Sequence, residues 1–234
     1  MVRMTSIKAP LLPLPNVVFF PKTALPLFVD APAYGRMIRD CALQGLPVTI
    51  SMAHIFNLPR DQKGTVHQQL RPTTIGCLGI PYILDEFPDG GLKVLIKGIA
   101  RTRLVSLAQN LPSPIYNVEI LEDSHSEVGN LSGQLTHINN ILESWVNKHV
   151  PNSVEREAFL KSLETAEHIT NYVSMLLIRD CEVRQALLET DSLRDRIHLL
   201  GALLREGIPL QENRDVVGAI KKFETLEKLT GTAN

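Results

Sequence analysis

The stretch "TTIGCLGIPYILDEFPDGGLKVLIKGIARTRLVSL", residues 73–107, predicts two long antiparallel strands joined by a tight turn. Valine, isoleucine and leucine are frequent in both arms, and the "PDGG" at 88–91 is turn chemistry in which glycine accepts a positive φ. Gly76, Gly79 and Gly98 interrupt the arms, and glycine inside a strand is typical of a bulge or a bend. The pattern therefore predicts a β-hairpin within a sheet that curls.

Composition limits the classes of partner. The chain has 234 residues, of which 44% are hydrophobic, and 24 basic residues nearly balance 25 acidic ones. A near-neutral chain has no overall field that attracts phosphate backbones, so nucleic acid is not a predicted partner. No apolar run approaches the roughly 18 residues that a membrane-spanning helix needs, so no membrane partner is predicted either. The three cysteines are widely spaced, which favours free thiols in the reducing cytoplasm.

The pattern of the first half of the chain predicts mainly short strands. In "PLLPLPNVVFFP", residues 10–21, the prolines exclude a helix and predict an extended edge strand, whose open edge near residues 12–20 would allow strand addition. The polar segment 57–72 predicts a loop. The remaining predictions are strands at 25–30 and 47–53, a helix at 31–45 that stops at Gly45, and a closing strand at 115–123.

The second half changes to helical periodicity. Leu135, Ile138, Leu142 and Trp145 recur every three to four positions and predict a helix with one apolar face that ends before Pro151. Ser153 is predicted to cap the next helix, and Ser192 with Asp195 resembles a capping box. Further apolar faces occur at 166–178, 191–207 and 215–231, which together predict a helical bundle.

Three separated blocks resemble the N-terminal domain of Lon-type ATP-dependent proteases. They are "LLPLPNVVFFP" with "LPLF", "IGCLGIPYI…PDGGLKVLIKGIARTRL", and "RQALLETDSLRDRIHLLGALL" at 184–204. The resemblance covers roughly residues 11–212. It implies an α+β chain: a PUA-like curled β-sheet pseudobarrel followed by an α-helical bundle. The expected divisions are a β-rich domain at 1–123, a helical bundle at 124–212 and a C-terminal amphipathic helix at 213–234.

The sequence departs from the whole protease. It contains no G-x-x-x-x-G-K-[ST] phosphate loop, and no counterpart of the family's Ser–Lys peptidase domain is found. If Asn234 is the natural end, the protein is a stand-alone relative. If the reading frame continues, the chain is the front portion of a full protease. On either alternative these residues are expected to be non-catalytic and to bind no cofactor.

Independent catalytic and metal sites are weakly indicated. Ser144 and Lys148 lie four residues apart on a predicted helix and can meet, whereas Lys161 and Ser162 can meet only with difficulty. Such pairs are common on solvated helix faces. The seven histidines form no H-E-x-x-H motif and no i, i+4 ligand pair, so no metal site is predicted.

The strongest functional expectation is an exposed apolar surface. Met52, Ile55 and Phe56 end a predicted strand just before the polar segment, where apolar side chains can receive unfolded or damaged polypeptide. The competing interpretation is that they only complete the core. Expected partners are unfolded polypeptides, a separate protease or chaperone, and further copies of the chain. The alternative functions are a self-contained hydrolase and an RNA-binding PUA-like module, although the scarcity of aromatic residues, 5%, argues against RNA.

Overall fold

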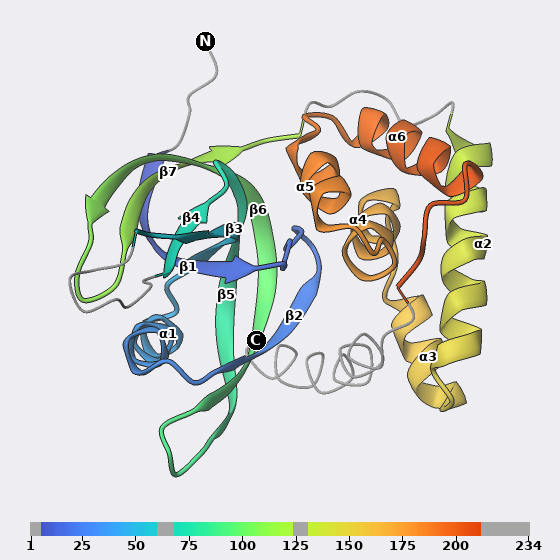
Figure 1. Cartoon of the computed structure of the whole chain (residues 1–234). Helices are drawn as coiled ribbons and strands as arrows, with labels where there is room; N and C mark the ends of the chain where they lie inside the picture. Colours follow the sequence, from blue (N-terminus) through green and yellow to red (C-terminus); the bar gives the residue numbers. More distant parts are fainter. Residues whose placement is uncertain (1–5, 60–67, 124–130, 212–234) are drawn as a thin grey trace. The chain divides into compact units, whose positions relative to one another are not determined.

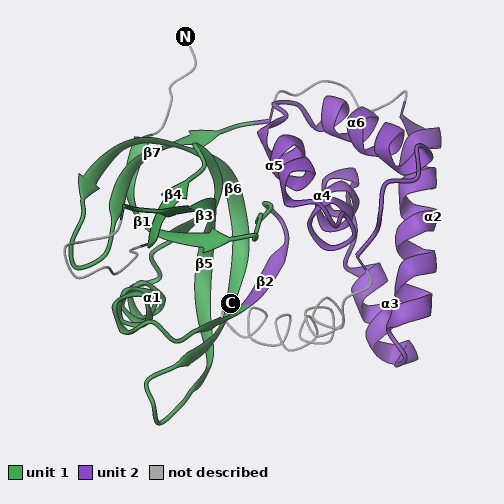
Figure 2. Cartoon of the chain, viewed as in Figure 1, with its two compact units in different colours: residues 1–21, 27–122 green, residues 22–26, 123–234 purple. Residues whose placement is uncertain are grey.

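The computed structural model describes residues 6–59, 68–123 and 131–211, and it divides into two compact units (Figures 1 and 2). Unit 1 comprises Met1–Pro21 and Leu27–Glu122, and unit 2 comprises Lys22–Pro26 and Asp123–Asn234. The strands are β1 (Ser6–Pro15), β2 (Ala24–Val29), β3 (Val48–Asn57), β4 (Gln68–Pro72), β5 (Ile75–Glu86), β6 (Leu92–Gln109) and β7 (Ile115–Leu121). The helices are α1 (Pro32–Gln44), α2 (Ser132–His149), α3 (Ser153–Lys161), α4 (Ala166–Leu176), α5 (Cys181–Glu189) and α6 (Leu193–Arg205).

Unit 1 is a curled sheet whose pairings close into a ring. The order is β1-β7-β6-β5-β3-β4, and β1 also pairs with β3 (Figure 1). The first half of β1 pairs antiparallel with β7, from Ser6 opposite Glu119 to Pro10 opposite Ile115. Its second half pairs parallel with β3, starting with Leu11 opposite Thr49. The predicted β5–β6 hairpin is confirmed, with Gly90 at φ 88° in the turn. The chain thus has the expected α+β pseudobarrel.

The prediction that residues 10–21 form an edge strand is wrong. The first half of β1 pairs with β7 and its second half with β3, so β1 closes the ring. Alternate residues of a strand direct their N–H groups to opposite edges of that strand. Proline has no N–H group, so it fits at positions that face an edge without a partner strand. The strand ends at Pro15, and Asn16 turns the chain at φ 59°. Val18, Phe19 and Phe20 then enter the core outside any strand.

Two facing glycines make room for this core segment. Gly79 and Gly98 are opposite one another at a register shift between β5 and β6, as the predicted bulge requires. A Cβ on Gly79 would lie 3.0 Å from the Phe19 ring, and a Cβ on Gly98 would lie 3.2 Å from it and overlap the carbonyl oxygen of Phe20. The missing side chains therefore let residues 19–20 lie directly against the sheet.

Helices α3 to α6 of unit 2 each begin at a residue whose side chain caps the helix. The Asn152 side chain accepts hydrogen bonds from the N–H groups of Val154 and Glu155, so Asn152, rather than the predicted Ser153, caps α3. An extended φ/ψ at position 152 places its side chain over the first turn, whereas Ser153 is already helical. The Ser192 cap of α6 is confirmed, because its hydroxyl accepts from the Asp195 N–H at 3.0 Å.

Arg196 holds the helices of unit 2 together from within. Its side chain is fully buried, and Nε donates to the carbonyl of Leu187 at 3.1 Å. Nη1 donates to Asn171 Oδ1, while Nη2 donates to Asp123 Oδ1 at 3.2 Å and to the Thr190 carbonyl. One guanidinium thus joins α4, α5 and α6 to Asp123, the first residue of the longer segment of unit 2.

Residues 22–26 are grouped with the helices, which the sequence did not predict. The Thr23 hydroxyl is 3.2 Å from Met175 Sδ, and Tyr172 hydrogen-bonds the backbone of Ala24. Burial raises the pKa of Tyr172, whose ring meets Phe159 edge-on at 5.2 Å. Over the three described ranges, no helix combines the length and hydropathy needed to cross a bilayer. The predicted helix at 215–231 lies outside the described residues.

Candidate functional site

A two-stranded ribbon extends from the closed ring of unit 1. β3 pairs with β5 over Val48–Ile50 and with β4 over Ala53–Asn57, while its pairing with β1 stops at Ala53. Burial changes at the same point, because Val48–Ala53 are buried and the following residues are exposed. We call residues 53–58 and 68–72 the β3–β4 ribbon. Among the described strands, β4 pairs only with β3, so its outer edge is open.

The two faces of the β3–β4 ribbon differ in chemistry. Ile55 is opposite Leu70 on one face, whereas His54 is opposite Arg71 and Phe56 is opposite Gln69 on the other. The Arg71 guanidinium lies 4.3 Å from the centroid of the Phe56 ring, and the His54 ring meets Phe56 edge-on at 6.4 Å. The β3–β4 ribbon therefore presents an aliphatic face and an aromatic, cationic face.

Three apolar side chains of the β3–β4 ribbon are exposed. The exposed fractions are 50% for Ile55, 41% for Phe56 and 40% for Leu58. Isolated exposed apolar residues are ordinary, but adjacent ones on a projecting pair of strands with an open edge are typical of an interaction surface.

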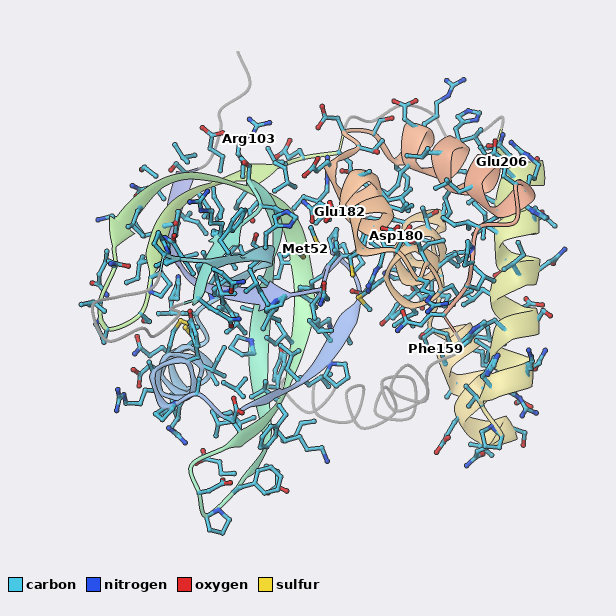
Figure 3. All side chains as sticks on the ribbon, viewed as in Figure 1. Met52, Arg103, Phe159, Asp180, Glu182 and Glu206 are labelled. Atoms are coloured by element: carbon cyan, nitrogen blue, oxygen red, sulfur yellow. The ribbon has the colours of Figure 1, made fainter. Side chains whose placement is uncertain are left out.

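The structure does not bring the three sequence-predicted residues to one surface. Met52 is only 3% exposed and lies among the core side chains of unit 1 (Figure 3). Its carbonyl accepts from the Thr73 N–H at 2.8 Å, and it pairs with Leu14. Ile55 and Phe56 are consecutive strand residues, so they point to opposite faces. Of the predicted set, Ile55 and Phe56 are exposed, one on each face of the β3–β4 ribbon.

Leu70 and Arg71 are not among the residues predicted from the sequence, because the polar pattern of residues 57–72 predicts a loop. That prediction is wrong for Gln68–Pro72, which form β4. "QQLRP" contains only one apolar residue apart from its proline, so it gives little strand signal, and its strand conformation depends on pairing with β3. Leu70 was the one sequence signal for a strand in this segment. In the structure it lies directly opposite Ile55.

The two weak catalytic pairs lie on α2 and at the end of α3. Ser144 and Lys148 both line a cavity of about 340 Å³ on α2. The Ser162 hydroxyl donates to the Phe159 carbonyl at the end of α3. Trp145, which also lines the cavity, donates its indole N–H to the Gln211 carbonyl and stacks on His149.

Two of the three cysteines, Cys41 and Cys77, are buried thiols. Burial raises the pKa of Cys77 and, together with the charge of Asp40, that of Cys41, so both thiols stay protonated and unreactive. Across residues 6–59, 68–123 and 131–211, no group of three or more His, Cys, Asp or Glu side chains is placed to hold a metal ion.

Comparison with known proteins identifies the family. The model of the ATP-dependent protease La (LON) substrate-binding domain matches residues 8–206. The chain is 26% identical over 228 residues to the Lon protease of Buchnera aphidicola, covering 94% of this chain and 28% of that protein. It is also 26% identical over 219 residues to Lon protease 1 of Myxococcus xanthus, covering 91% of this chain and 26% of the relative. The chain thus spans about a quarter of the length of these relatives.

Solved structures show the same fold. The N-terminal domain of the Mycobacterium avium complex Lon protease superposes with a TM-score of 0.62 at 12% identity, covering 86% of this chain and 100% of that one. The Lon N-terminal domain protein from Xanthomonas campestris gives a TM-score of 0.58 at 20% identity, covering 87% and 99%. With a match that runs from β1 to the end of α6, the chain belongs to the family of LON substrate-binding domains.

Proposed function

We propose that this chain is a non-catalytic Lon N-terminal-like module that recognises unfolded or damaged polypeptide through the β3–β4 ribbon. The observation that carries the proposal is the exposure of Ile55 and Phe56 beside the open edge of β4. The membership of the chain in a substrate-binding family supports the same role.

The chemistry of the β3–β4 ribbon suits an extended, apolar polypeptide. The open edge of β4 offers backbone hydrogen bonds to an added strand, while further apolar side chains of the same polypeptide cover Ile55 on one face or Phe56 on the other. Covering one half-exposed isoleucine or phenylalanine contributes about 1 kcal/mol, so each contact is weak and binding needs several contacts. This is the behaviour expected of a surface that accepts many unfolded sequences, since none of its contacts specifies one partner.

Binding of unfolded polypeptide at the β3–β4 ribbon would serve proteolysis or assembly that other domains or other proteins carry out. The match lies in the substrate-binding domain, and the curated relatives that contain it are Lon proteases. The module would present polypeptide to an ATP-dependent protease, either in the same chain or as a separate protease or chaperone partner. The same exposed surface would also support self-association between copies of the module.

The double variant Ile55→Ser/Phe56→Ser is expected to bind unfolded polypeptide about thirtyfold more weakly, because it removes two apolar contacts of about 1 kcal/mol each. Fluorescence anisotropy with labelled, permanently unfolded carboxymethylated lactalbumin measures the affinity. The matched control is Val154→Ser/Leu199→Ser, which removes two exposed apolar side chains from unit 2. Sedimentation of the same variants tests self-association.

Both variants change exposed residues, so both are expected to keep the far-ultraviolet circular dichroism of the wild type. If the two double variants bind the unfolded probe equally well, the β3–β4 ribbon is not the binding surface. If the wild type binds the unfolded probe no better than folded lactalbumin, the proposed function itself is wrong.

A further inference from the structure

Unit 1 carries a second exposed aromatic surface, at the tip of the β5–β6 hairpin. Phe28, near the end of β2, and Phe87, in the hairpin turn, are 58% and 38% exposed. Their rings meet edge-on with centroids 5.4 Å apart. Two aromatic rings from segments distant in the sequence thus meet outside the core, which is common where proteins bind one another.

The hairpin turn holds these rings in place. The Phe87 N–H donates to the Gly91 carbonyl and the Gly90 N–H to the Phe87 carbonyl, both at 2.9 Å. The Gly91 N–H donates to Asp89 Oδ1 at 3.0 Å. The Phe28 ring lies directly over Gly91, where a Cβ would lie only 2.8 Å from Phe28 Cζ. The arrangement is therefore fixed before any partner arrives, which lowers the entropy cost of binding.

The charge around the rings is negative. Asp30 follows Phe28, and Asp85, Glu86 and Asp89 surround Phe87 in the sequence, and all four carboxylates are exposed. Glu86 is paired with Arg39 of α1 at 3.1 Å, and Lys93 is opposite Asp85 in the sheet. Arg39 and Lys93 thus offset part of the negative charge of the four carboxylates. We call Phe28, Phe87, Asp30, Asp85 and Asp89 the hairpin-tip patch.

The hairpin-tip patch and the β3–β4 ribbon differ in one decisive respect. The face of Phe56 already carries a cation of the chain itself, the Arg71 guanidinium. Within the described ranges, neither Phe28 nor Phe87 has a cation over its ring. An open aromatic face attracts a cation through its quadrupole, and the adjacent carboxylates attract the same charge.

We propose that the hairpin-tip patch is a second docking surface, which binds polypeptide segments that combine arginine or lysine with apolar residues. The cationic side chain lies over an aromatic ring within reach of the carboxylates, and the apolar neighbour covers the exposed edge of the ring pair. This surface is separate from the β3–β4 ribbon, so the inference stands independently of the proposed function.

The test uses a fluorescein-labelled peptide that repeats Arg-Leu-Ser, with a Glu-Leu-Ser repeat as its counterpart, and anisotropy at low ionic strength. The variant Asp30→Asn/Asp85→Asn/Asp89→Asn removes three charges, and the amide oxygen introduced at position 89 remains able to accept the Gly91 N–H. Its affinity for the Arg-Leu-Ser peptide is expected to fall about fivefold, because each exposed charge contributes modestly. Phe87→Ala is expected to weaken the same binding, since it removes one of the two rings.

The matched control removes the same charge elsewhere. Glu157→Gln/Glu164→Gln/Glu206→Gln changes three exposed carboxylates of unit 2, of which Glu206 is labelled in Figure 3. This control is expected to bind the Arg-Leu-Ser peptide like the wild type. Equal losses in the two triple variants would mean that net charge alone acts, and the proposal would be wrong.

Two further results separate this proposal from the function of the β3–β4 ribbon. Ile55→Ser/Phe56→Ser is expected to keep its affinity for the Arg-Leu-Ser peptide while losing affinity for the unfolded, carboxymethylated probe. If instead that variant loses the Arg-Leu-Ser peptide, the β3–β4 ribbon binds it and the hairpin-tip proposal fails, whereas the proposed function stands. Equal binding of the Glu-Leu-Ser peptide by the wild type would also overturn the proposal.

Discussion

Replacing Arg196 by methionine is expected to destabilise unit 2 by about 3–5 kcal/mol, the cost of removing one partner of a buried ion pair. The fully buried guanidinium satisfies Asp123 Oδ1, Asn171 Oδ1 and two backbone carbonyls. Methionine fills a similar volume but donates no hydrogen bond, so these acceptors would lose the hydrogen bonds that they receive from residue 196.

Urea unfolding, monitored by tryptophan fluorescence, measures the loss of stability in unit 2. Trp145 is the only tryptophan of the chain and lies in α2, so its emission reports on unit 2. Arg194→Met is the matched control, because Arg194 is an exposed arginine of the same helix. The control is expected to change the unfolding midpoint little. Equal midpoints for the two variants would contradict the role assigned to Arg196.

Gly98→Ala is expected to destabilise unit 1 by about 3 kcal/mol, the upper part of the usual range for overpacking a core. A Cβ at this position would overlap the carbonyl oxygen of Phe20 and lie 3.1 Å from Pro21 Cα. Both neighbours are backbone atoms, which cannot rotate away as a flexible side chain would. The sheet and the buried segment 18–20 would therefore have to separate.

Amide hydrogen exchange measured by mass spectrometry locates this effect. In the Gly98→Ala variant, amides of β5 and β6 are expected to exchange faster than in the wild type, while those of α4 and α6 keep their rates. Gly133→Ala is the control, since a Cβ there meets nothing within 4 Å and alanine favours the helix. Unchanged exchange in β5 and β6 would show that the approach of residue 20 does not constrain the sheet.

Local chemistry predicted those parts of the fold that neighbouring residues decide. The "PDGG" turn, the helix that stops at Gly45 with φ 64°, and the Ser192 cap are all confirmed, because each depends on residues within a few positions. The closure of β1 onto both β7 and β3 depends on residues about 40 to 110 positions away. Nothing near the prolines specifies that closure, so the edge-strand prediction failed.

Whether a side chain is buried or exposed also depends partly on residues that are distant in the sequence. Arg196 follows a helical pattern in which an arginine is usually solvated, and only the tertiary partners Asp123 and Asn171 explain its burial. Met52, Ile55 and Phe56 were predicted to be exposed together, but Met52 is buried because it lies just before the point where the pairing with β1 ends and exposure begins. Sequence alone does not locate that point, because the end of the β1–β3 pairing determines it.

Site-specific photo-crosslinking is the most direct test of whether the β3–β4 ribbon contacts unfolded polypeptide. Benzoylphenylalanine replaces Ile55 in one preparation and Val154, which is 64% exposed on α3, in another. We expect carboxymethylated lactalbumin to crosslink strongly at position 55 and weakly at position 154, and excess unlabelled unfolded protein to suppress the strong product. Equal crosslinking at the two positions, or a product at position 55 that the competitor does not suppress, would contradict recognition at the β3–β4 ribbon.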